Sequence, residues 1–334
     1  MHAFTAHRLV IQATVVTPVV LNEHQGSALR GALYHGLRRR FCALLQEARE
    51  CAACPLWGTC PVCTLVSTLA PEGRLGRDIA RPYTIQPPLD GAATYYAPGR
   101  PFLFGITLYA DALRLFPYVV LALQELETSG LGRRDPANNW RRGTLRLEAI
   151  YAENPLTGQR APISRRGENL VLVPDLPITH EQICQRAAQG ETADNIRLRL
   201  LTPTRLTAQG RLVKPGQLTF AILMARLLDR LESLAQHFSP TPLQLDYPAL
   251  LRAAETVRAA HNATRWVELR SYSTRQGRAT PIGGLMGEVT FHAPDWRPFL
   301  PWLLWGQFTH VGKDAVKGNG WYTVAFSGQQ TAGG

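Results

Sequence analysis

The sequence predicts an α+β protein made of two copies of one βαββαβ unit, the first of which carries a cysteine-rich insertion. Three observations predict this class. A strand-like alternation of apolar and polar residues leads through Thr-Pro into a long helix at 8–47 and again at 196–238. A glycine-rich loop followed by a strand closes each half, at 130–147 and 311–324. The chain of 334 residues exceeds the usual size of one domain.

The first half contains each element of the unit in order. The expected elements are a strand at 8–17, a helix at 27–47, an insertion, strands at 82–86 and 102–110, a helix at 112–128 and a strand at 144–152. At about 100° per residue, one apolar face of the first helix is formed by Leu29, Leu33, Leu37, Phe41 and Leu44. His35 points away from that face and is therefore expected at the surface.

The second half repeats this order. Its expected elements are a strand at 196–202, a helix at 218–238, strands at 264–273 and 282–292, a helix at 296–305 and a strand after Gly320, with an additional short helix at 247–260. The order βαββαβ is the ferredoxin-like arrangement shared by RNA-recognition motifs. We expect an N-terminal domain at 1–190 with a cysteine insertion at 48–66, a C-terminal domain at 191–327 with a glycine-rich loop, and a disordered tail at 328–334.

The charge of the chain indicates a polyanionic partner. Lys and Arg number 36 against 25 Asp and Glu, for a net charge of +11, and all but three of the 36 are arginine. The planar guanidinium suits phosphate and stacks on bases, although an arginine-rich proteome alone would also give this composition. Two of the three lysines, Lys313 and Lys317, lie in the late glycine-rich segment, which offers backbone N–H groups and positive charge to a phosphate chain. This combination favours RNA.

The sequence also predicts the cellular compartment. No apolar run approaches the ~18 residues that span a bilayer, and the first residues lack the apolar stretch of a secretion signal. We therefore expect a cytoplasmic protein, in which disulfides are disfavoured.

A cluster of four cysteines predicts a metal site. Cys51, Cys54, Cys60 and Cys63 form the pattern C-x2-C-x5-C-x2-C, in which each closely spaced pair can place two thiolates on one ion. Zinc is preferred over an iron–sulfur cluster, which the short central spacing leaves open. Four cysteines leave no open position for water, so the site is expected to be structural. Cys42 and Cys184 are expected to be lone buried thiols, although Cys42 is also a fifth candidate ligand.

Several ordered motifs are shared with a known family. Across 196–326 they are Thr202-Pro-Thr-Arg-Leu206, Arg265-Trp266, Tyr272-Ser-Thr-Arg275-Gln276, Pro281-Ile-Gly283-Gly284-Leu-Met-Gly287-Glu288-Val289 and His310-Val-Gly312-Lys313 through Gly318-Asn-Gly320. Over the first half, Gly26-Ser-Ala-Leu-Arg-Gly31 and the cysteines carry a looser match. The sequence resembles the CRISPR-associated endoribonucleases of the repeat-associated mysterious protein (RAMP) superfamily that cut precursor crRNA within its repeats.

The resemblance implies tandem ferredoxin-like domains and a cut that needs no metal. In such a cut the 2′-hydroxyl of the substrate attacks the adjacent phosphate and leaves a 2′,3′-cyclic phosphate and a 5′-hydroxyl. Asp314 and Lys317 stand where this family usually has small or hydroxyl and aromatic residues, a departure that bears on the contacts of the loop. The implied partner is CRISPR repeat RNA, with a CRISPR effector complex as a further possible partner.

The candidate catalytic residues follow from the chemistry of RNA self-cleavage, which needs a base, an acid and a cation. His35 is the first choice for the base because the flanking Arg38 and Arg39 favour its neutral form, and the family usually has its base near this helix. His24 is the second choice. His310 adjoins the glycine loop and is a candidate acid, and Tyr34 either orients the phosphate or covers the core edge. His35 could equally be a solvated surface histidine, and His310 could equally be one satisfied at a strand or helix end.

The candidate RNA-binding residues gather in four places. They are Arg38 and Arg39 on the first helix, Arg133 and Arg134 in the first glycine loop, Arg270, Arg275 and Arg278 around a hairpin turn, and Gly312, Lys313, Lys317, Gly318 and Gly320 in the second loop. Arg141 and Arg142 line the first loop in the same manner. Charged hairpin tips also serve solubility. Trp140 and Tyr322 either stack on bases or belong to the core.

Two other functions compete with the nuclease. The same double fold can serve as a non-catalytic crRNA-binding subunit of an effector complex, since a fold does not dictate activity. A zinc-containing DNA-binding regulator ranks lower because the sequence has no helix-turn-helix signal.

Overall fold

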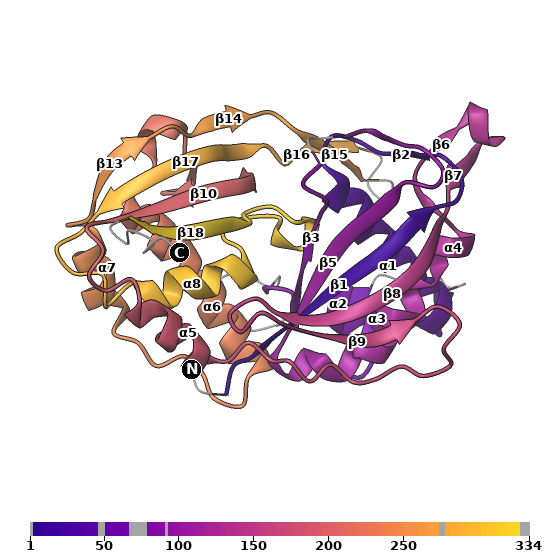
Figure 1. The fold of residues 1–334 in the computed structure, drawn as a ribbon, viewed down its shortest axis with the longest axis horizontal. Helices are drawn as coiled ribbons and strands as arrows, with labels where there is room; N and C mark the ends of the chain where they lie inside the picture. Colours follow the sequence, from indigo (N-terminus) through magenta and orange to yellow (C-terminus); the bar gives the residue numbers. More distant parts are fainter. Residues whose placement is uncertain (1–2, 46–50, 67–78, 91–92, 274–277, 328–334) are drawn as a thin grey trace, which may run out of the picture. The chain divides into compact units, whose positions relative to one another are not determined.

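The computed structural model of the chain describes residues 3–45, 51–66, 79–90, 93–273 and 278–327 (Figure 1). The expected tail at 328–334 and the candidate Arg275 lie outside the described residues. The chain divides into two compact units: an N-terminal unit, Thr5–Pro177, and a C-terminal unit, Ile178–Gly334 together with Met1–Phe4. No helix within the described ranges has both the length and the apolar character to span a bilayer.

The N-terminal unit is a five-stranded antiparallel sheet with helices. Its elements are β1 (Ala6–Val15), β2 (Val19–Val20), α1 (Gln25–Phe41), α2 (Pro61–Val66), β3 (Tyr83–Gln86), β4 (Tyr95–Tyr96), β5 (Pro101–Tyr109), α3 (Phe116–Leu123), α4 (Glu125–Thr128), β6 (Leu131–Asp135), β7 (Arg141–Gly143), β8 (Leu145–Asn154) and β9 (Gln159–Arg165). The sheet order is β3-β5-β1-β8-β9. The first four strands have the order that a βαββαβ unit gives, and β9 adds an outer strand.

The C-terminal unit has a second antiparallel sheet. Its elements are α5 (His180–Ala188), β10 (Asn195–Thr204), β11 (Thr207–Ala208), β12 (Arg211–Leu212), α6 (Phe220–Phe238), α7 (Tyr247–Ala254), β13 (Arg258–Asn262), β14 (Arg265–Val267), β15 (Arg270–Ser273), β16 (Arg278–Pro281), β17 (Gly284–His292), α8 (Leu300–Thr309) and β18 (Tyr322–Ser327). The order is β13-β17-β10-β18, and β14 also pairs with β17.

Alternation and helical periodicity place the cores. In β1, Leu9, Ile11 and Ala13 are buried while their neighbours are half-buried. In α1 the apolar face is buried at Leu29, Leu33 and Leu37. Gly36 brings α1 close to α3, because a Cβ there would lie 2.6 Å from the Ala122 carbonyl oxygen. His35, the residue before Gly36, is exposed.

Some element boundaries differ from those expected. α1 ends at Phe41, and the helix expected at 112–128 is divided into a 3-10 turn at Ala110–Leu115, α3 and α4. The helix expected at 247–260 ends at Ala254, because residues 258–262 pair with β17 as the strand β13. The helix expected at 296–305 occupies Leu300–Thr309.

The C-terminal unit begins at Ile178, whereas the sequence placed the boundary at 191. The helix α5 accounts for the difference, since it packs against α8. Trp305 Nε1 donates a hydrogen bond to His180 Nδ1 at 3.1 Å, and the planes of the two rings are nearly parallel. Thr179 and Gln182 form a capping box that starts this helix just after the boundary.

Candidate active site

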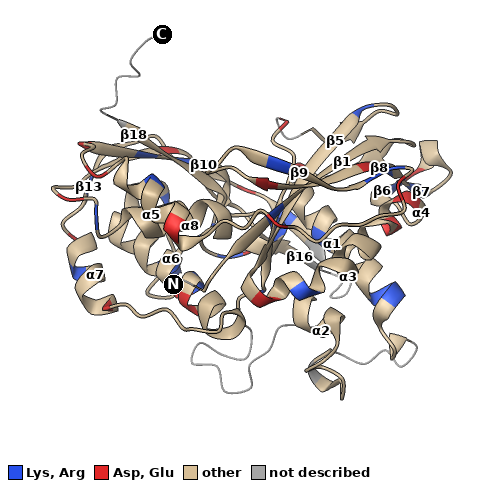
Figure 2. Cartoon of the chain, turned by 60° about the horizontal axis from the view of Figure 1, so that its bottom comes forward, with Lys and Arg blue, Asp and Glu red and all other residues tan. Residues whose placement is uncertain are grey.

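The N-terminal unit contains a pocket of about 830 Å³, which we call the His35 pocket. It lies among α1, α4, the glycine loop and the β6–β7 hairpin, and it is lined by Thr17, Ala32, His35, Gly36, Arg39, Glu125, Thr128, Ser129, Gly130, Arg134, Asn138, Trp140, Arg141, Arg142 and Thr144. Four arginines and one carboxylate give the lining a positive balance. Basic residues also occur throughout both units (Figure 2). The pocket is therefore distinguished by the arginines grouped around His35, and not by positive charge alone.

His35 is an exposed side chain on α1 and the histidine of the pocket lining. Its pKa is lowered from the ordinary value of 6.5, first by partial burial of the ring and then by the positive charge of Arg142 and of three arginines on α1, Arg38, Arg39 and Arg30. A histidine with a lowered pKa is neutral near pH 7 and has a nitrogen free to accept a proton. The arrangement therefore suits a general base.

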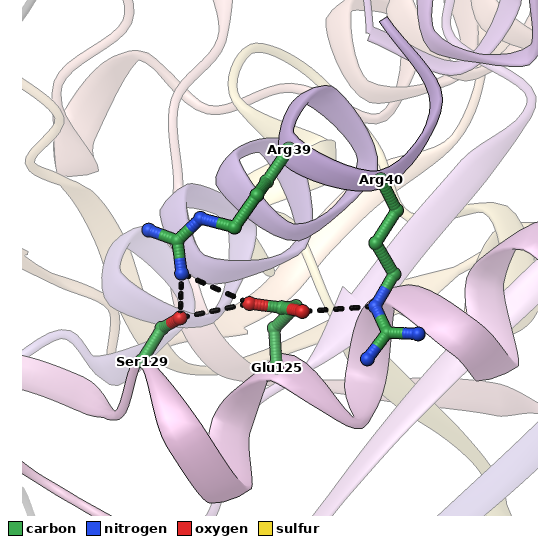
Figure 3. A network of polar contacts seen from close by, with 4 residues as sticks. All are labelled: Arg39, Arg40, Glu125 and Ser129. Carbon is green, nitrogen blue, oxygen red and sulfur yellow. Dashed lines mark hydrogen bonds and ion pairs between the residues drawn. The ribbon is translucent and has the colours of Figure 1, made fainter.

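Arg39 is held in an ion-pair network with α4 (Figure 3). Its Nη1 lies 3.0 Å from Glu125 Oε2, and Arg40 Nε lies 2.9 Å from Glu125 Oε1. Ser129 Oγ donates to Glu125 Oε2 at 2.8 Å, and Arg39 also contacts Ser129. Burial alone would raise the pKa of Glu125, but the hydrogen bonds from Ser129 and Arg40 and the nearby charges lower it overall. Glu125 thus stays ionised and offsets the charge of Arg39, which joins α1 to α4.

Three other pocket arginines come from the β6–β7 hairpin. Arg134 and Arg141 are exposed and Arg142 is half-buried. Arg134 and Arg142 are partners in the hairpin register, so the two strands bring their positive charges to one place. Within the described part of the chain, none of these three guanidinium groups forms an ion pair. They are therefore available to an anionic ligand.

Hydrogen bonds fix the hairpin that carries these arginines. The Thr144 N–H donates to Thr17 Oγ1 at 2.9 Å, which ties the strand after the hairpin to the end of β1. Asn138 Nδ2 donates to the Arg142 carbonyl oxygen at 3.0 Å. At Gly132, where φ is +87°, a Cβ would lie 2.2 Å from the Val20 carbonyl oxygen, so the loop packs directly on β2. Hydrogen bonds and close packing thus hold the loop that forms this wall of the pocket.

The glycine loop of the C-terminal unit repeats this construction. The Trp321 N–H donates to Thr202 Oγ1 at 3.0 Å, as Thr144 does to Thr17. At Gly312, where φ is +82°, a Cβ would lie 2.5 Å from the Arg205 carbonyl oxygen, the counterpart of the contact between Gly132 and Val20. The correspondence in hydrogen bonds and close approaches accords with the repeat in the sequence.

The second loop differs from the first in its side chains. His310 has no exposed surface, stacks on Trp321 with the rings 6.0 Å apart, and donates from Nδ1 to the Asn319 carbonyl oxygen at 3.1 Å. Lys317 Nζ lies 2.8 Å from Asp314 Oδ1, while Lys313 is exposed. His310 therefore holds the loop rather than facing solvent, and Lys313 is the better placed of the two lysines for a phosphate.

The other candidates lie outside the His35 pocket. His24 is buried at the start of α1, where its side chain makes no capping hydrogen bond. Tyr34 accepts a hydrogen bond from Arg38 Nη1 at 3.1 Å, and Arg133 Nε donates to Asn22 Oδ1 at 2.7 Å. Arg270 is exposed at the start of β15, and the hairpin continues into β16 at Arg278. Of the twelve predicted RNA-binding residues, Arg39 and Arg134 line the pocket.

The cysteine cluster is only partly gathered. The thiols of Cys51, Cys60 and Cys63 lie close enough to influence one another's pKa, and Cys42 lies near Cys51. Burial raises the pKa of the Cys51 and Cys63 thiols, so a metal must displace their protons to bind. Within the described ranges no group of three or more His, Cys, Asp or Glu has the spacing of a metal site. Zinc binding thus stays a proposal, supported by the motif and by the grouping of three thiols.

We expect purified protein to contain one zinc ion per chain, because structural zinc sites contribute strongly to folding. Elemental analysis measures the metal directly, and visible absorbance would identify an iron–sulfur cluster instead. Cys63→Ser should lose the metal, whereas Cys184→Ser, which changes an exposed cysteine of the other unit, should keep it. Metal-free protein with four reactive thiols at Cys51, Cys54, Cys60 and Cys63 would refute the site.

Comparisons with known proteins identify the family. A family model described as an N-terminal domain matches residues 4–176, and the model of the CRISPR-associated endoribonuclease Cas6 matches residues 198–322. Over residues 198–322 the chain therefore belongs to the family of CRISPR-associated Cas6 proteins. No curated protein matches the sequence significantly.

Solved structures share the fold at low sequence identity. A chain of a partial Cas6-RT-Cas1–Cas2 complex matches with a TM-score of 0.62 and 15% identity over 98% of this chain and 47% of that chain. A Cas6 product complex gives a TM-score of 0.55 at 17% identity, covering 96% and 99% of the two chains. Thermus thermophilus Cas6 gives 0.51 at 17% identity, covering 97% and 99%. The chain thus spans 47% and 29% of the two matched chains from Cas6-RT-Cas1–Cas2 complexes.

Proposed function

We propose that the chain is a metal-independent endoribonuclease that cleaves precursor crRNA within CRISPR repeats, and that its two units are both ferredoxin-like. Membership of the Cas6 family supports the substrate class. The observation that carries the activity is the His35 pocket, where a histidine of lowered pKa lies with three arginines that have no carboxylate partner among the described residues. The pocket offers both a proton acceptor and positive charge to one phosphate.

The chemistry follows from these groups. The neutral imidazole of His35 accepts the proton of a ribose 2′-hydroxyl, and the freed 2′-oxygen forms a bond to the adjacent phosphorus. The bond from phosphorus to the 5′-oxygen breaks, and that oxygen takes a proton from solvent. The products are a 2′,3′-cyclic phosphate and a 5′-hydroxyl.

The hairpin arginines stabilise the transition state. Negative charge builds on the phosphate oxygens as the 2′-oxygen attacks, and fixed cations lower the energy of that charge. Arg134, Arg141 and Arg142 line the same pocket as His35 and carry the required charge. Guanidinium groups bind phosphate oxygens through paired N–H donors, so they supply what a metal ion would otherwise provide.

Cleavage of a CRISPR repeat RNA in excess EDTA tests this function. The expected product has a 2′,3′-cyclic phosphate on its upstream fragment, detected as a terminus that resists phosphatase until acid opens the ring. Tight binding with intact RNA would instead support the non-catalytic crRNA-binding subunit. Cleavage that stops in EDTA and returns with Mg²⁺ would refute metal independence.

A further inference from the structure

Trp140 occupies an unusual position on the wall of the His35 pocket. Its side chain is 67% exposed, although it is one of the largest apolar side chains in the protein. It lies at the tip of the β6–β7 hairpin, two residues before Arg142, and lines the same pocket as His35. Among the described residues the indole makes no aromatic or cation–π contact. The Trp140 ring is therefore not part of the hydrophobic core.

The backbone at Trp140 is strained. Asn139 and Trp140 have φ values of +52° and +57°, a region that tryptophan rarely adopts. The Trp140 N–H donates to the Asp135 carbonyl oxygen at 2.9 Å, which holds the turn closed. Strained non-glycine residues persist where the surroundings fix them, and they cluster at ligand sites. A glycine would adopt this conformation without strain. We therefore infer that tryptophan occupies this position because its side chain is needed there.

The surroundings of the ring identify its ligand by chemistry. A flat aromatic surface beside three arginines offers one wall for a base and positive charge for its phosphate. A volume of about 830 Å³ lies within the range of pockets that hold one small organic ligand, and a nucleotide belongs to that size class. Bases inside a duplex have both faces covered by their neighbours, so only an unpaired base can present a face to the indole.

We propose that Trp140 stacks on an unpaired nucleobase next to the phosphate held by the hairpin arginines, so that the RNA must be single-stranded at this nucleotide. The inference rests on the proposed function in one respect, which is that this phosphate is the one cleaved. Trp140 is a positioning residue, because it holds the base while His35 and the arginines act on the backbone.

A fluorescence titration tests the stacking without requiring cleavage. The probe is an eight-nucleotide single-stranded RNA with one 2-aminopurine, a base whose emission is quenched by stacking, and all proteins carry His35→Ala to keep the RNA intact. We expect Trp140→Ala to lose the quenching and to weaken binding roughly 5- to 150-fold, the range of base–aromatic stacking. Trp140→Phe should restore most of both. The same RNA in a duplex should show no dependence on Trp140.

Two further variants keep the result interpretable. Trp140→Gly removes the ring and relieves the backbone strain, so it separates loss of stacking from loss of folding and should behave as Trp140→Ala does. Tyr95→Ala removes another exposed aromatic of the same unit, 54% exposed and outside the pocket lining, and should leave quenching unchanged. Unaltered quenching and affinity in Trp140→Gly would overturn the stacking. Quenching that depends on Trp140, together with repeat RNA that stays intact when incubated with the protein that retains His35, would refute the nuclease and leave the stacking intact.

Discussion

Replacing His35 with alanine should lower the single-turnover cleavage rate about 100- to 10,000-fold, the usual contribution of a general base. The 2′-hydroxyl would keep its proton, and no other histidine lines the pocket. RNA affinity should stay close to that of the wild type, because the arginines of the β6–β7 hairpin are unchanged. Rates measured at saturating protein separate the chemical step from binding.

The control for this variant is His261→Ala. His261 is also an exposed histidine, but it lies on β13 of the C-terminal unit and outside the pocket lining. It should cleave at the wild-type rate. Full activity of His35→Ala would remove the assignment of the base.

Replacing Arg142 with alanine should lower the cleavage rate about 100- to 1,000-fold, the range for loss of one donor to developing charge. Arg142 is the strongest single charge acting on His35, and it shares the pocket with Arg134 and Arg141. Arg142→Lys should recover part of the rate, since lysine restores the charge without the paired donors of arginine. The rate is again measured under single-turnover conditions.

Arg146→Ala is the matched control. Arg146 is an exposed arginine of the same unit that pairs with Glu148 at 2.9 Å and lies outside the pocket lining. Its removal changes the net charge equally and should leave cleavage nearly unchanged. If both arginine variants lose activity alike, the effect of Arg142 reflects overall charge rather than its place beside His35.

The periodicity of apolar residues predicted the strands and helices whose burial follows from neighbouring residues in the sequence. β1, β5, β8 and α6 fall close to their expected ranges because apolar alternation and helical spacing directly reflect which face is buried. The strand β13 was wrongly expected as the end of a helix, since its residues are exposed and its strand pairing comes from β17, distant in sequence. The short α5 was missed because its contact with α8 is also non-local.

The site shows the same division. The exposure of His35 followed from the helical projection of α1, whereas its electrostatic interaction with Arg142 depends on a hairpin register that spacing alone does not give. The two arginine pairs, Arg133-Arg134 and Arg141-Arg142, flank a short turn, and this was the sequence signal that could have predicted the hairpin. The burial of His310 against Trp321 could not be read from the sequence, because the same histidine beside a glycine loop fits a surface role equally well.

The pH dependence of single-turnover cleavage in EDTA tests the central claim most directly, namely that neutral His35 among arginines is the base. Activity requires the unprotonated ring, so the rate falls as pH drops through the pKa of His35. Because burial and Arg142 lower that pKa, the midpoint should lie below about 6.5, and Arg142→Ala should move it to higher pH. A wild-type midpoint at or above 6.5, or one that Arg142→Ala leaves in place, would contradict the account.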